Sequence, residues 1–343
     1  MRDRAKLRFA LFGFGYWGPN IARNIVSCDE AELSAIVDVS PQRRTVASEL
    51  YPSSKIHHSI DDLDLGGIDA AVVATPASSH VALSTALLRS GIHVLVEKPL
   101  ALKVADAVQL VNLAYERNRV LMVDHTYLFS DAVNLMNSLS KSGQLGQLIH
   151  FDSTRVNLGI FQPDTSVIWD LAVHDISILQ YVTGLSPKSV SATAHSHISS
   201  KHPVVSSLSL QFDEDFFAHI SVSWISPVKV RRVALTGTKG TVVFDDVASD
   251  EKIKIYDSGV DAVLESEGVR ALLKYRLGDI AVPRLAGVEA LRREIDHFVD
   301  CIIRAKEPVS SGKDSLMVLA VLEAAEESAR SGGTPTNIRY VGR

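Results

Sequence analysis

Short apolar runs alternate with amphipathic stretches through the first third of the chain. Five runs predict strands, at residues 7–12, 33–38, 69–74, 92–96 and 120–124. Between them, apolar positions recur at helical spacing near 18–27, 41–50, 79–90 and 103–117. Runs that are apolar throughout are typical of central parallel strands, which are buried on both faces. The pattern predicts an α/β domain over residues 1–124: a doubly wound parallel sheet with its ligand crevice at the carboxyl ends of the strands.

After residue 125 the pattern favours strands that alternate apolar and polar positions. We expect a helix at 129–142 and then strands at 147–157, 187–197, 204–212, 216–224, 230–237 and 240–245. Two later helices are expected at 288–305 and 313–330, whereas the polar stretch 257–286 reads as a long loop over the site. Residues 125–343 are therefore predicted to form an α+β domain with a large, mostly antiparallel open sheet.

The second domain also carries a prediction about assembly. Its strands hold many apolar residues, and too few helices follow residue 187 to cover both faces of the sheet. A monomer would then expose a large apolar patch, which soluble monomers rarely do. We expect a homodimer or homotetramer paired through this sheet, with the same surface on both copies.

Composition excludes several classes of protein. The 343 residues suffice for two domains, and 46% hydrophobic with 22% charged residues is ordinary for a globular protein. A net charge of −5 argues against a nucleic-acid partner. We expect no membrane partner and a cytoplasmic location, because no apolar run has the length of a membrane span and the first residues lack a signal-peptide pattern. Cys28 and Cys301 are expected to be packed thiols.

A glycine-rich segment at residues 13–18 joins the first strand to the first helix. In a dinucleotide-binding turn, Gly13 would permit the tight bend, Gly15 the approach of a pyrophosphate, and Gly18 close packing of helix on strand. The helix N-terminus would offer N–H groups to the phosphates. Asp38 ends the next strand about 20 residues later, where a carboxylate can accept from ribose hydroxyls and favours NAD. Arg43 and Arg44 follow closely and could instead hold the 2′-phosphate of NADP.

Two segments supply candidate proton-transfer groups. Glu97, Lys98 and Pro99 directly follow a predicted strand, so Lys98 opens onto the crevice. Beside an oxidised nicotinamide its ammonium form is disfavoured, and Lys98 can act as a base. Asp170 and His174 stand four residues apart on a predicted helix at 169–182, where a carboxylate can orient an imidazole. The alternatives are a surface lysine paired with Glu97, and a helix cap beside an internally bonded histidine.

Other candidates remain open. His195, His197 and His202 could hold a metal but are more typical of a solvated strand end. Arg231 and Arg232 are either a charged sheet edge or an anion contact. We expect no metal.

In this order and spacing the motifs resemble those of the Gfo/Idh/MocA oxidoreductases, a family named for glucose-fructose oxidoreductase, inositol dehydrogenase and rhizopine catabolism. The resemblance covers essentially the whole chain and implies a Rossmann domain followed by an open-sheet domain that often pairs. It implies that Lys98, Asp170 and His174 are catalytic. It implies a cofactor site of Gly13, Phe14, Gly15, Tyr16, Trp17, Gly18, Asp38, Arg43, Thr75, Pro76, His80, Glu97, Lys98 and Trp169. It implies a substrate site of Lys98, Tyr127, Arg155, Asn157, Asp170 and His174.

Residues 15–20, 155–159 and 169–172 look like the branch of nucleotide-sugar 3-dehydrogenases of surface-polysaccharide pathways, such as the UDP-N-acetylglucosaminuronate type. Val173 stands where that branch more readily has proline. The resemblance implies hydride transfer between a ring hydroxyl, at C3, of a sugar or nucleotide-linked sugar and NAD, with NADP as second candidate. Two alternatives stay open: a glycosidase of the same fold that recycles NAD, and a non-catalytic NAD(P)-binding regulator, against which the presence of Lys98, Asp170 and His174 argues.

Overall fold

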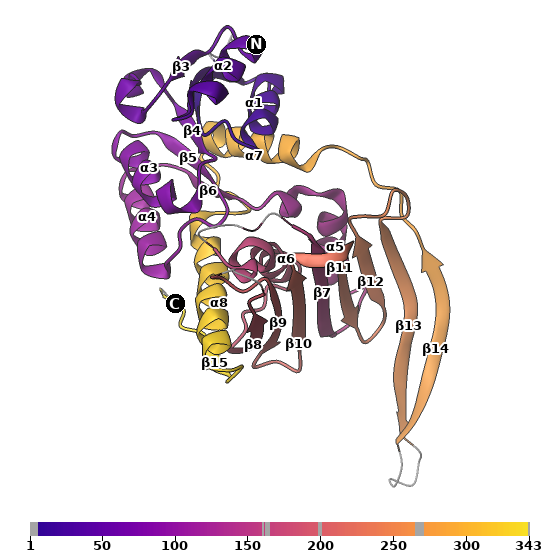
Figure 1. Cartoon of the computed structure of the whole chain (residues 1–343). Helices are drawn as coiled ribbons and strands as arrows, with labels where there is room; N and C mark the ends of the chain where they lie inside the picture. The colour runs from indigo at the N-terminus through magenta and orange to yellow at the C-terminus, as the bar shows by residue number, and fades with distance from the viewer. Residues whose placement is uncertain (1–5, 160, 162–164, 198–200, 265–270, 342–343) are drawn as a thin grey trace. The chain divides into compact units, whose positions relative to one another are not determined.

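The computed structural model describes residues 6–159, 161, 165–197, 201–264 and 271–341 (Figure 1). The chain divides into two compact units. The first comprises Met1–Phe129, Val288–Leu319 and Tyr340–Arg343, and the second comprises Ser130–Gly287 and Ala320–Arg339. The sequence predicted one domain boundary, after residue 124, whereas in the structure Val288–Leu319 return to the first unit. That return is stabilised by the Phe9–Phe298 edge contact, with ring centroids 6.0 Å apart, and by the Arg23–Glu289 ion pair at 2.7 Å.

The first unit is built on a six-stranded parallel sheet in the order β3-β2-β1-β4-β5-β6. Its strands are β1 (Leu7–Phe12), β2 (Ala31–Val37), β3 (Lys55–His57), β4 (Ala70–Val73), β5 (His93–Glu97) and β6 (Leu121–Asp124). Its helices are α1 (Gly18–Ser27), α2 (Pro41–Leu50), α3 (Ala77–Arg89), α4 (Val104–Glu116) and α7 (Ala290–Arg304), with short turns η1 (Ile60–Asp62), η2 (Leu65–Gly67) and η3 (Thr126–Phe129). The strand order reverses between β1 and β4, which leaves a crevice at the carboxyl ends of these strands.

The second unit carries a nine-stranded sheet in the order β14-β13-β12-β11-β7-β10-β9-β8-β15. Only β7 and β10 pair in parallel among the described strands; the other pairs are antiparallel, as predicted. The strands are β7 (Leu148–Leu158), β8 (Ser189–His195), β9 (Val205–Gln211), β10 (Phe217–Ser223), β11 (Ile225–Gly237), β12 (Thr241–Asp245), β13 (Ile253–Leu264), β14 (Ala271–Ala281) and β15 (Thr336–Asn337). The helices are α5 (Asp131–Lys141), η4 (Ile168–Ala172) and α6 (Val173–Thr183); α8 (Gly312–Arg330) contributes residues to both units.

The prediction of a loop at 257–286 is wrong, because most of this stretch forms the β13–β14 hairpin. Figure 1 shows the hairpin as a ribbon that extends beyond the neighbouring strands of its sheet. Only Ile253–Tyr256 pair with β12, and the rest of β13 pairs with β14 alone. Beyond Tyr256 the described side chains of this ribbon are exposed or half-buried, so no apolar alternation identified its two strands in the sequence.

The apolar strand residues of the second unit, which we expected a second copy of the chain to cover, are largely buried within one chain. That expectation rests on ten apolar strand residues. Val205 and Phe217 are half-buried, and the other eight are buried: Val204, Leu208, Leu210, Phe212, Phe216, Ile220, Val222 and Trp224. On β9 and β10 the opposite face carries half-buried polar side chains such as Ser207, Ser209 and His219. Homo-oligomerisation stays a prediction, but this premise for it is corrected.

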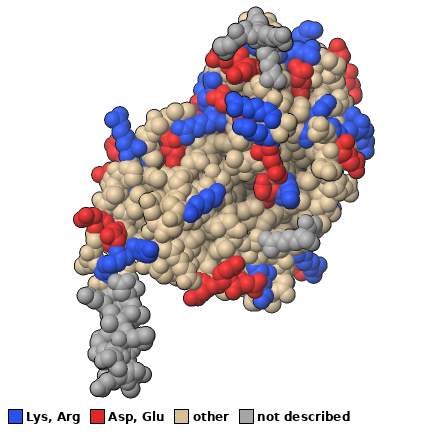
Figure 2. Space-filling view, turned by 180° about the vertical axis from the view of Figure 1, so that it is seen from behind, with Lys and Arg blue, Asp and Glu red and all other residues tan. Residues whose placement is uncertain are grey.

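Three further observations concern the cysteines, the length of the apolar helices and the surface charge. Cys28 and Cys301 are buried free thiols, as predicted. No helix in the described part of the chain is both long and apolar enough to cross a bilayer. On the face drawn in Figure 2, basic and acidic side chains are interspersed among uncharged residues.

Candidate active site

The glycine turn closes against the ends of two strands. Gly13 has φ +95°, and its N–H donates to the Val37 carbonyl at 2.8 Å. A Cβ atom on Gly13 would lie 2.4 Å from the Ala74 carbonyl oxygen, and one on Gly18 would lie 2.6 Å from that of Gly13. Glycine is therefore required at both positions, by the backbone conformation and by the space.

Asp38 fastens this turn to the end of β2. Its carboxylate accepts from the Phe14 N–H at 2.6 Å and the Ser40 N–H at 2.8 Å, and the residue is only 5% exposed. The Arg43 guanidinium lies 3.7 Å from the same carboxylate and 3.4 Å from where a Cβ on Gly15 would stand. Asp38 and Arg43 thus lie together beside the turn.

The loops that follow β4 and β5 are held together by a buried histidine. His80, on α3, is 1% exposed, and its two ring nitrogens lie 2.8 Å from the carbonyl oxygens of Thr75 and Pro99. Thr75 Oγ1 lies 2.7 Å from Ser79 Oγ. Sequence-predicted residues Thr75, Pro76, His80 and the 97–99 segment therefore come together at the carboxyl edge of the first sheet.

Lys98 lies next to a cluster of buried acids. Glu97 and Asp124 end β5 and β6 and are register partners. Burial first, and the Asp124 carboxylate second, raise the pKa of Glu97 well above its ordinary value, whereas the Lys98 charge opposes this rise. Asp124 accepts from the N–H and the hydroxyl of Thr126, at 3.1 and 2.5 Å. Glu97 keeps some exposed surface, but its carboxyl group is enclosed.

The third acid, Glu294, comes from α7. It is fully buried, and neither carboxyl oxygen has a hydrogen-bond partner among the described residues. Burial, and then the Asp124 carboxylate, raise the pKa of Glu294 well above its ordinary value. Two carboxyl groups with raised pKa values, those of Glu97 and Glu294, therefore lie in the buried cluster around Asp124.

Sequence reasoning missed Asp124, His125 and Glu294. Burial, and then Lys98, lower the pKa of His125 to about 4, so it is neutral. Asp124 and His125 end or follow a predicted strand, as Glu97 and Lys98 do, and that position could have identified them. The signal for Glu294 is a carboxyl at i+3 from Leu291, on the apolar face of the helix.

In the second unit, Asp170 and His174 lie across a change of helix type. Residues 168–172 form a π-helical turn, η4, before α6 begins at Val173, where the sequence predicted one continuous α-helix. Within 165–179 only Asp170, Leu171 and His174 are half-buried, and the remaining residues are buried. The two predicted proton-transfer residues are therefore the polar side chains that this segment leaves accessible. Such π-turns occur frequently at functional sites.

Both ends of this segment are anchored from the sheet. Arg155 on β7 donates from Nε and Nη2 to the Asp175 carboxylate, each at 2.9 Å, and Ser153 Oγ donates to it at 2.8 Å. Arg155 and Asp175 are both buried. At the other end, the Trp224 indole N–H donates to Asp170 Oδ2 at 3.0 Å. The sequence predicted Arg155 as a substrate contact, whereas the structure shows its guanidinium in a buried ion pair.

The remaining predicted residues are placed as follows. Tyr127 lies on η3 of the first unit, and Asn157 and Trp169 lie in the second unit, with Trp169 5% exposed. Tyr16 and Trp17 on the glycine turn are 82% and 48% exposed. Arg231 pairs with Asp246 at 3.3 Å. Among the described residues no group of three His, Cys, Asp or Glu side chains could hold a metal.

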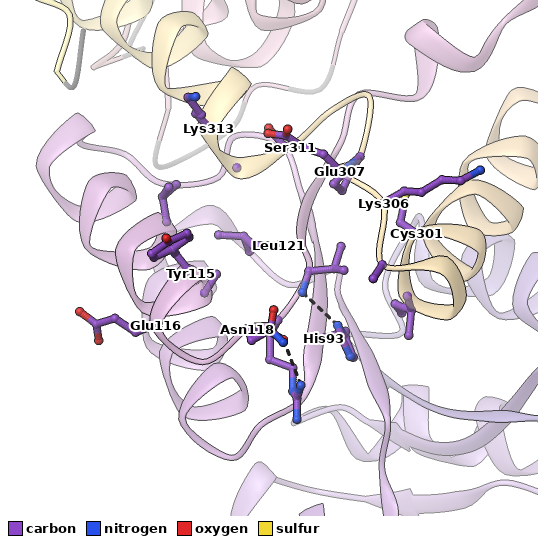
Figure 3. Close-up of a pocket in the computed structure, with 18 residues that line it drawn as sticks. His93, Tyr115, Glu116, Asn118, Leu121, Cys301, Lys306, Glu307, Ser311 and Lys313 are labelled. Atoms are coloured by element: carbon purple, nitrogen blue, oxygen red, sulfur yellow. Dashed lines mark hydrogen bonds between the residues drawn. The ribbon is translucent and has the colours of Figure 1, made fainter.

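A cavity of about 860 Å³ in the first unit lies at the opposite edge of the sheet (Figure 3). His93 and Leu121, at the amino ends of β5 and β6, line it with Tyr115 and Cys301. His93 Nδ1 accepts from the Val120 N–H at 3.0 Å. The predicted crevice is at the carboxyl ends of the same strands, so this cavity is separate from the predicted cofactor site.

The glycine turn fits a dinucleotide. Neighbouring backbone excludes side chains at Gly13 and Gly18, whereas a Cβ atom on Gly15 would meet only the Arg43 guanidinium, at 3.4 Å. The α1 cap residue Trp17 makes no side-chain bond to the first turn of that helix, whose N–H groups can then serve an anion. Asp38 offers a carboxylate at the end of β2. The residues present therefore match the requirements of a dinucleotide phosphate and ribose.

Comparison with known proteins agrees with this geometry. Residues 7–125 match a family model described as an oxidoreductase family with an NAD-binding Rossmann fold, and residues 133–243 match the GFO/IDH/MocA C-terminal domain. UDP-N-acetylglucosamine 3-dehydrogenase of Acidithiobacillus ferrooxidans is 26% identical, over 92% of this chain and 94% of that protein. A D-apiose dehydrogenase of Paraburkholderia graminis is 23% identical, over 96% of this chain and 89% of that protein. The solved levoglucosan dehydrogenase–NADH complex shares the fold, with a TM-score of 0.83, 17% identity, and coverage of 98% of this chain and 100% of that one.

Proposed function

The chain belongs to the Gfo/Idh/MocA family of oxidoreductases, and from this premise we propose that it catalyses NAD-dependent oxidation and reduction of a ring hydroxyl on a sugar or nucleotide-linked sugar. The named relatives act on sugars or related polyols, including UDP-N-acetylglucosamine, apiose and inositol. We assign C3 of a nucleotide sugar as the reacting position, supported by the relative that is a UDP-N-acetylglucosamine 3-dehydrogenase. The predicted catalytic residues Lys98, Asp170 and His174 are all present in the chain.

The observation that carries the proposal is the set of enclosed acids around Lys98. A lysine facing fully ionised carboxylates would keep its proton, because opposite charges favour the charged form. Here burial raises the pKa values of Glu97 and Glu294. The cluster of Glu97, Asp124 and Glu294 therefore carries less negative charge than three ionised carboxylates would. We therefore assign the proton exchange with the substrate hydroxyl to Lys98 Nζ.

We assign the remaining roles to this chain's own groups. When bound, the nicotinamide ring supplies the acceptor or donor of the hydride. Lys98 Nζ takes the proton of the substrate hydroxyl in the oxidative direction. His174 exchanges protons with the substrate, and Asp170 holds the substrate and supports the charge that develops on the imidazole. The glycine turn and Asp38 bind the dinucleotide, and the anchored Arg155 keeps the segment 169–175 in place.

NAD is the proposed cofactor in preference to NADP. The negative charge of Asp38 opposes a 2′-phosphate, and this carboxylate already faces the Arg43 guanidinium at 3.7 Å. Arg43 is therefore engaged by Asp38, which reduces its value as a phosphate ligand.

The test is a panel of nucleotide sugars, free sugars and cyclitols offered with NAD and with NADP, while absorbance of the reduced cofactor is followed. Turnover of a nucleotide sugar with release of NADH supports the full proposal, and the position of the new carbonyl is then read from the product. Turnover of free sugars or cyclitols only would refute the nucleotide-sugar assignment. Cleavage of a glycosidic bond with NADH retained on the protein would instead identify the NAD-recycling glycosidase.

A further inference from the structure

We infer that Trp224 is a positioning residue that holds the Asp170 carboxylate for the reaction, and that Gly159 is present to make room for its indole ring. This inference rests on the proposed function, in which Asp170 takes part. The sequence pattern identified Trp224 only as an apolar residue at the end of the predicted strand 216–224.

The main chain of Trp224 is held on both sides. The residue joins β10 to β11, and its N–H donates to the Val204 carbonyl while its own carbonyl accepts from the Gly159 N–H, each at 2.9 Å. Both bonds fix the backbone position from which the side chain departs. The indole is 2% exposed, so it reaches Asp170 from inside the unit and does not itself offer a surface to substrate.

The indole ring is also held. The Phe161 ring stacks on it with centroids 5.7 Å apart and planes 27° apart. On the other side, a Cβ atom on Gly159 would lie 2.7 Å from Trp224 Cδ1, a distance that side chains do not tolerate. The last residue of the 155–159 motif is therefore glycine because only glycine lets the Trp224 indole come this close to the end of β7.

The anchored indole has one polar atom, and that atom donates to Asp170. Nε1 lies 3.0 Å from Asp170 Oδ2, and an indole N–H can only donate. The bond therefore favours the rotation of the carboxylate that turns Oδ2 towards the indole. Asp170 sits in a π-helical turn, where the main-chain bonding differs from that of an α-helix. A fixed donor from the sheet compensates for this by setting the direction of the side chain.

Arg155 provides the matching anchor at the far end of the segment, on Asp175. Trp224 and Arg155 thus fix residues 170 and 175, with His174 between them. The two anchors differ in kind: Arg155 binds an acid that is fully buried, whereas Trp224 binds one that is half-buried and accessible. Only the second can act on a group that meets substrate.

The kinetic test uses Trp224→Phe, which removes the donor and keeps a ring, and Gly159→Ala, which keeps the donor and displaces the ring. Each should lower kcat about tenfold to a hundredfold with a smaller change in KM, the loss expected for one bond to a charged group. In an Asp170→Asn background both changes should have almost no further effect. Equal losses with and without Asp170 would overturn the inference and leave Trp224 a core residue.

Tyr181→Phe is the matched control. This variant also removes one aromatic donor in the same unit, the Tyr181 hydroxyl. That hydroxyl donates to Asn134 at 2.8 Å, so its loss takes no bond away from Asp170. Its kcat should stay within about twofold of the wild type, and its unfolding midpoint should show that loss of a donor alone is tolerated.

A spectroscopic measurement tests the bond without any substrate. The chain has three tryptophans, so ¹⁵N-labelled protein gives three indole N–H signals, and Trp224→Phe identifies the one from residue 224. Asp170→Ala should move that signal, while the signal of Trp17 in the first unit serves as reference. An unmoved Trp224 signal would overturn the inference, whether or not the proposed reaction is found. A moved signal together with an inactive substrate panel would refute the proposed function alone.

Discussion

Replacing Glu294 by glutamine should make the protein more stable at neutral pH. Glu294 is fully buried, its carboxyl oxygens have no hydrogen-bond partner among the described residues, and burial and Asp124 raise its pKa well above the ordinary 4.5. Glutamine has nearly the same shape as the protonated acid and never ionises. Its amide group carries two N–H donors, whereas the protonated acid carries one O–H donor.

The magnitude follows from proton linkage. Below about pH 4.5 the acid is protonated in both the folded and the unfolded chain, and the variant and wild type should differ little. Above that pH the unfolded chain loses the proton while the folded chain keeps it, so the wild type loses stability as pH rises towards the folded pKa. With one proton bound to the folded state only, the loss is about 1.4 kcal/mol per pH unit. The advantage of Glu294→Gln should therefore grow by that amount per unit.

The assay is urea unfolding of wild type and variant at several values between about pH 4 and pH 8, with the difference in free energy plotted against pH. Contributions of Glu97 and other acids are common to both proteins and largely cancel in the difference. Glu116→Gln, on the exposed end of α4, is the control, and its difference from wild type should stay flat. A flat or falling line for Glu294→Gln would refute the conclusion that Glu294 is held protonated.

Three further predictions concern function and assembly. Catalytic efficiency should favour NAD over NADP, and Asp38→Ala should weaken NAD binding because the carboxylate also fastens the glycine turn; a wild-type preference for NADP would contradict the assignment. Lys98→Met should abolish turnover while cofactor affinity, followed by nicotinamide fluorescence, stays within about tenfold, and His174→Ala should slow turnover by about a hundredfold. Near-normal rates for Lys98→Met would refute the assignment of Lys98 as the proton-transfer residue. Light scattering should show an assembly larger than the 37.3 kDa chain, and a wild-type monomer would refute self-association. Tyr275 and Leu277 on the edge strand β14 are 76% and 90% exposed, so replacing both by aspartate should reduce the mass of the assembly.

Periodicity predicted most of the first sheet because its central strands are buried on both faces, and burial leaves a direct mark on composition. All residues of β4 and β6 are buried, and β5 is buried except at its two half-buried ends. The short edge strand β3 has an exposed or half-buried pattern and was missed. The hairpin at β13 and β14 was missed for the same reason, since its described side chains beyond Tyr256 are exposed or half-buried.

The sequence by itself determined the parts of the site whose chemistry is local. The glycines at 13 and 18 are required by the strand–turn–helix they occupy, and Lys98 reaches the crevice because its strand ends there. Only the tertiary structure decided which side chains from distant parts of the sequence contact the acidic residues Asp124 and Asp170. Glu294 comes beside Asp124 from a helix about 170 residues further on, and Trp224 reaches Asp170 from a different strand. Periodicity reports whether a residue is buried, but the identity of its neighbour depends on how the elements pack, and the charge state of a buried group depends on that neighbour.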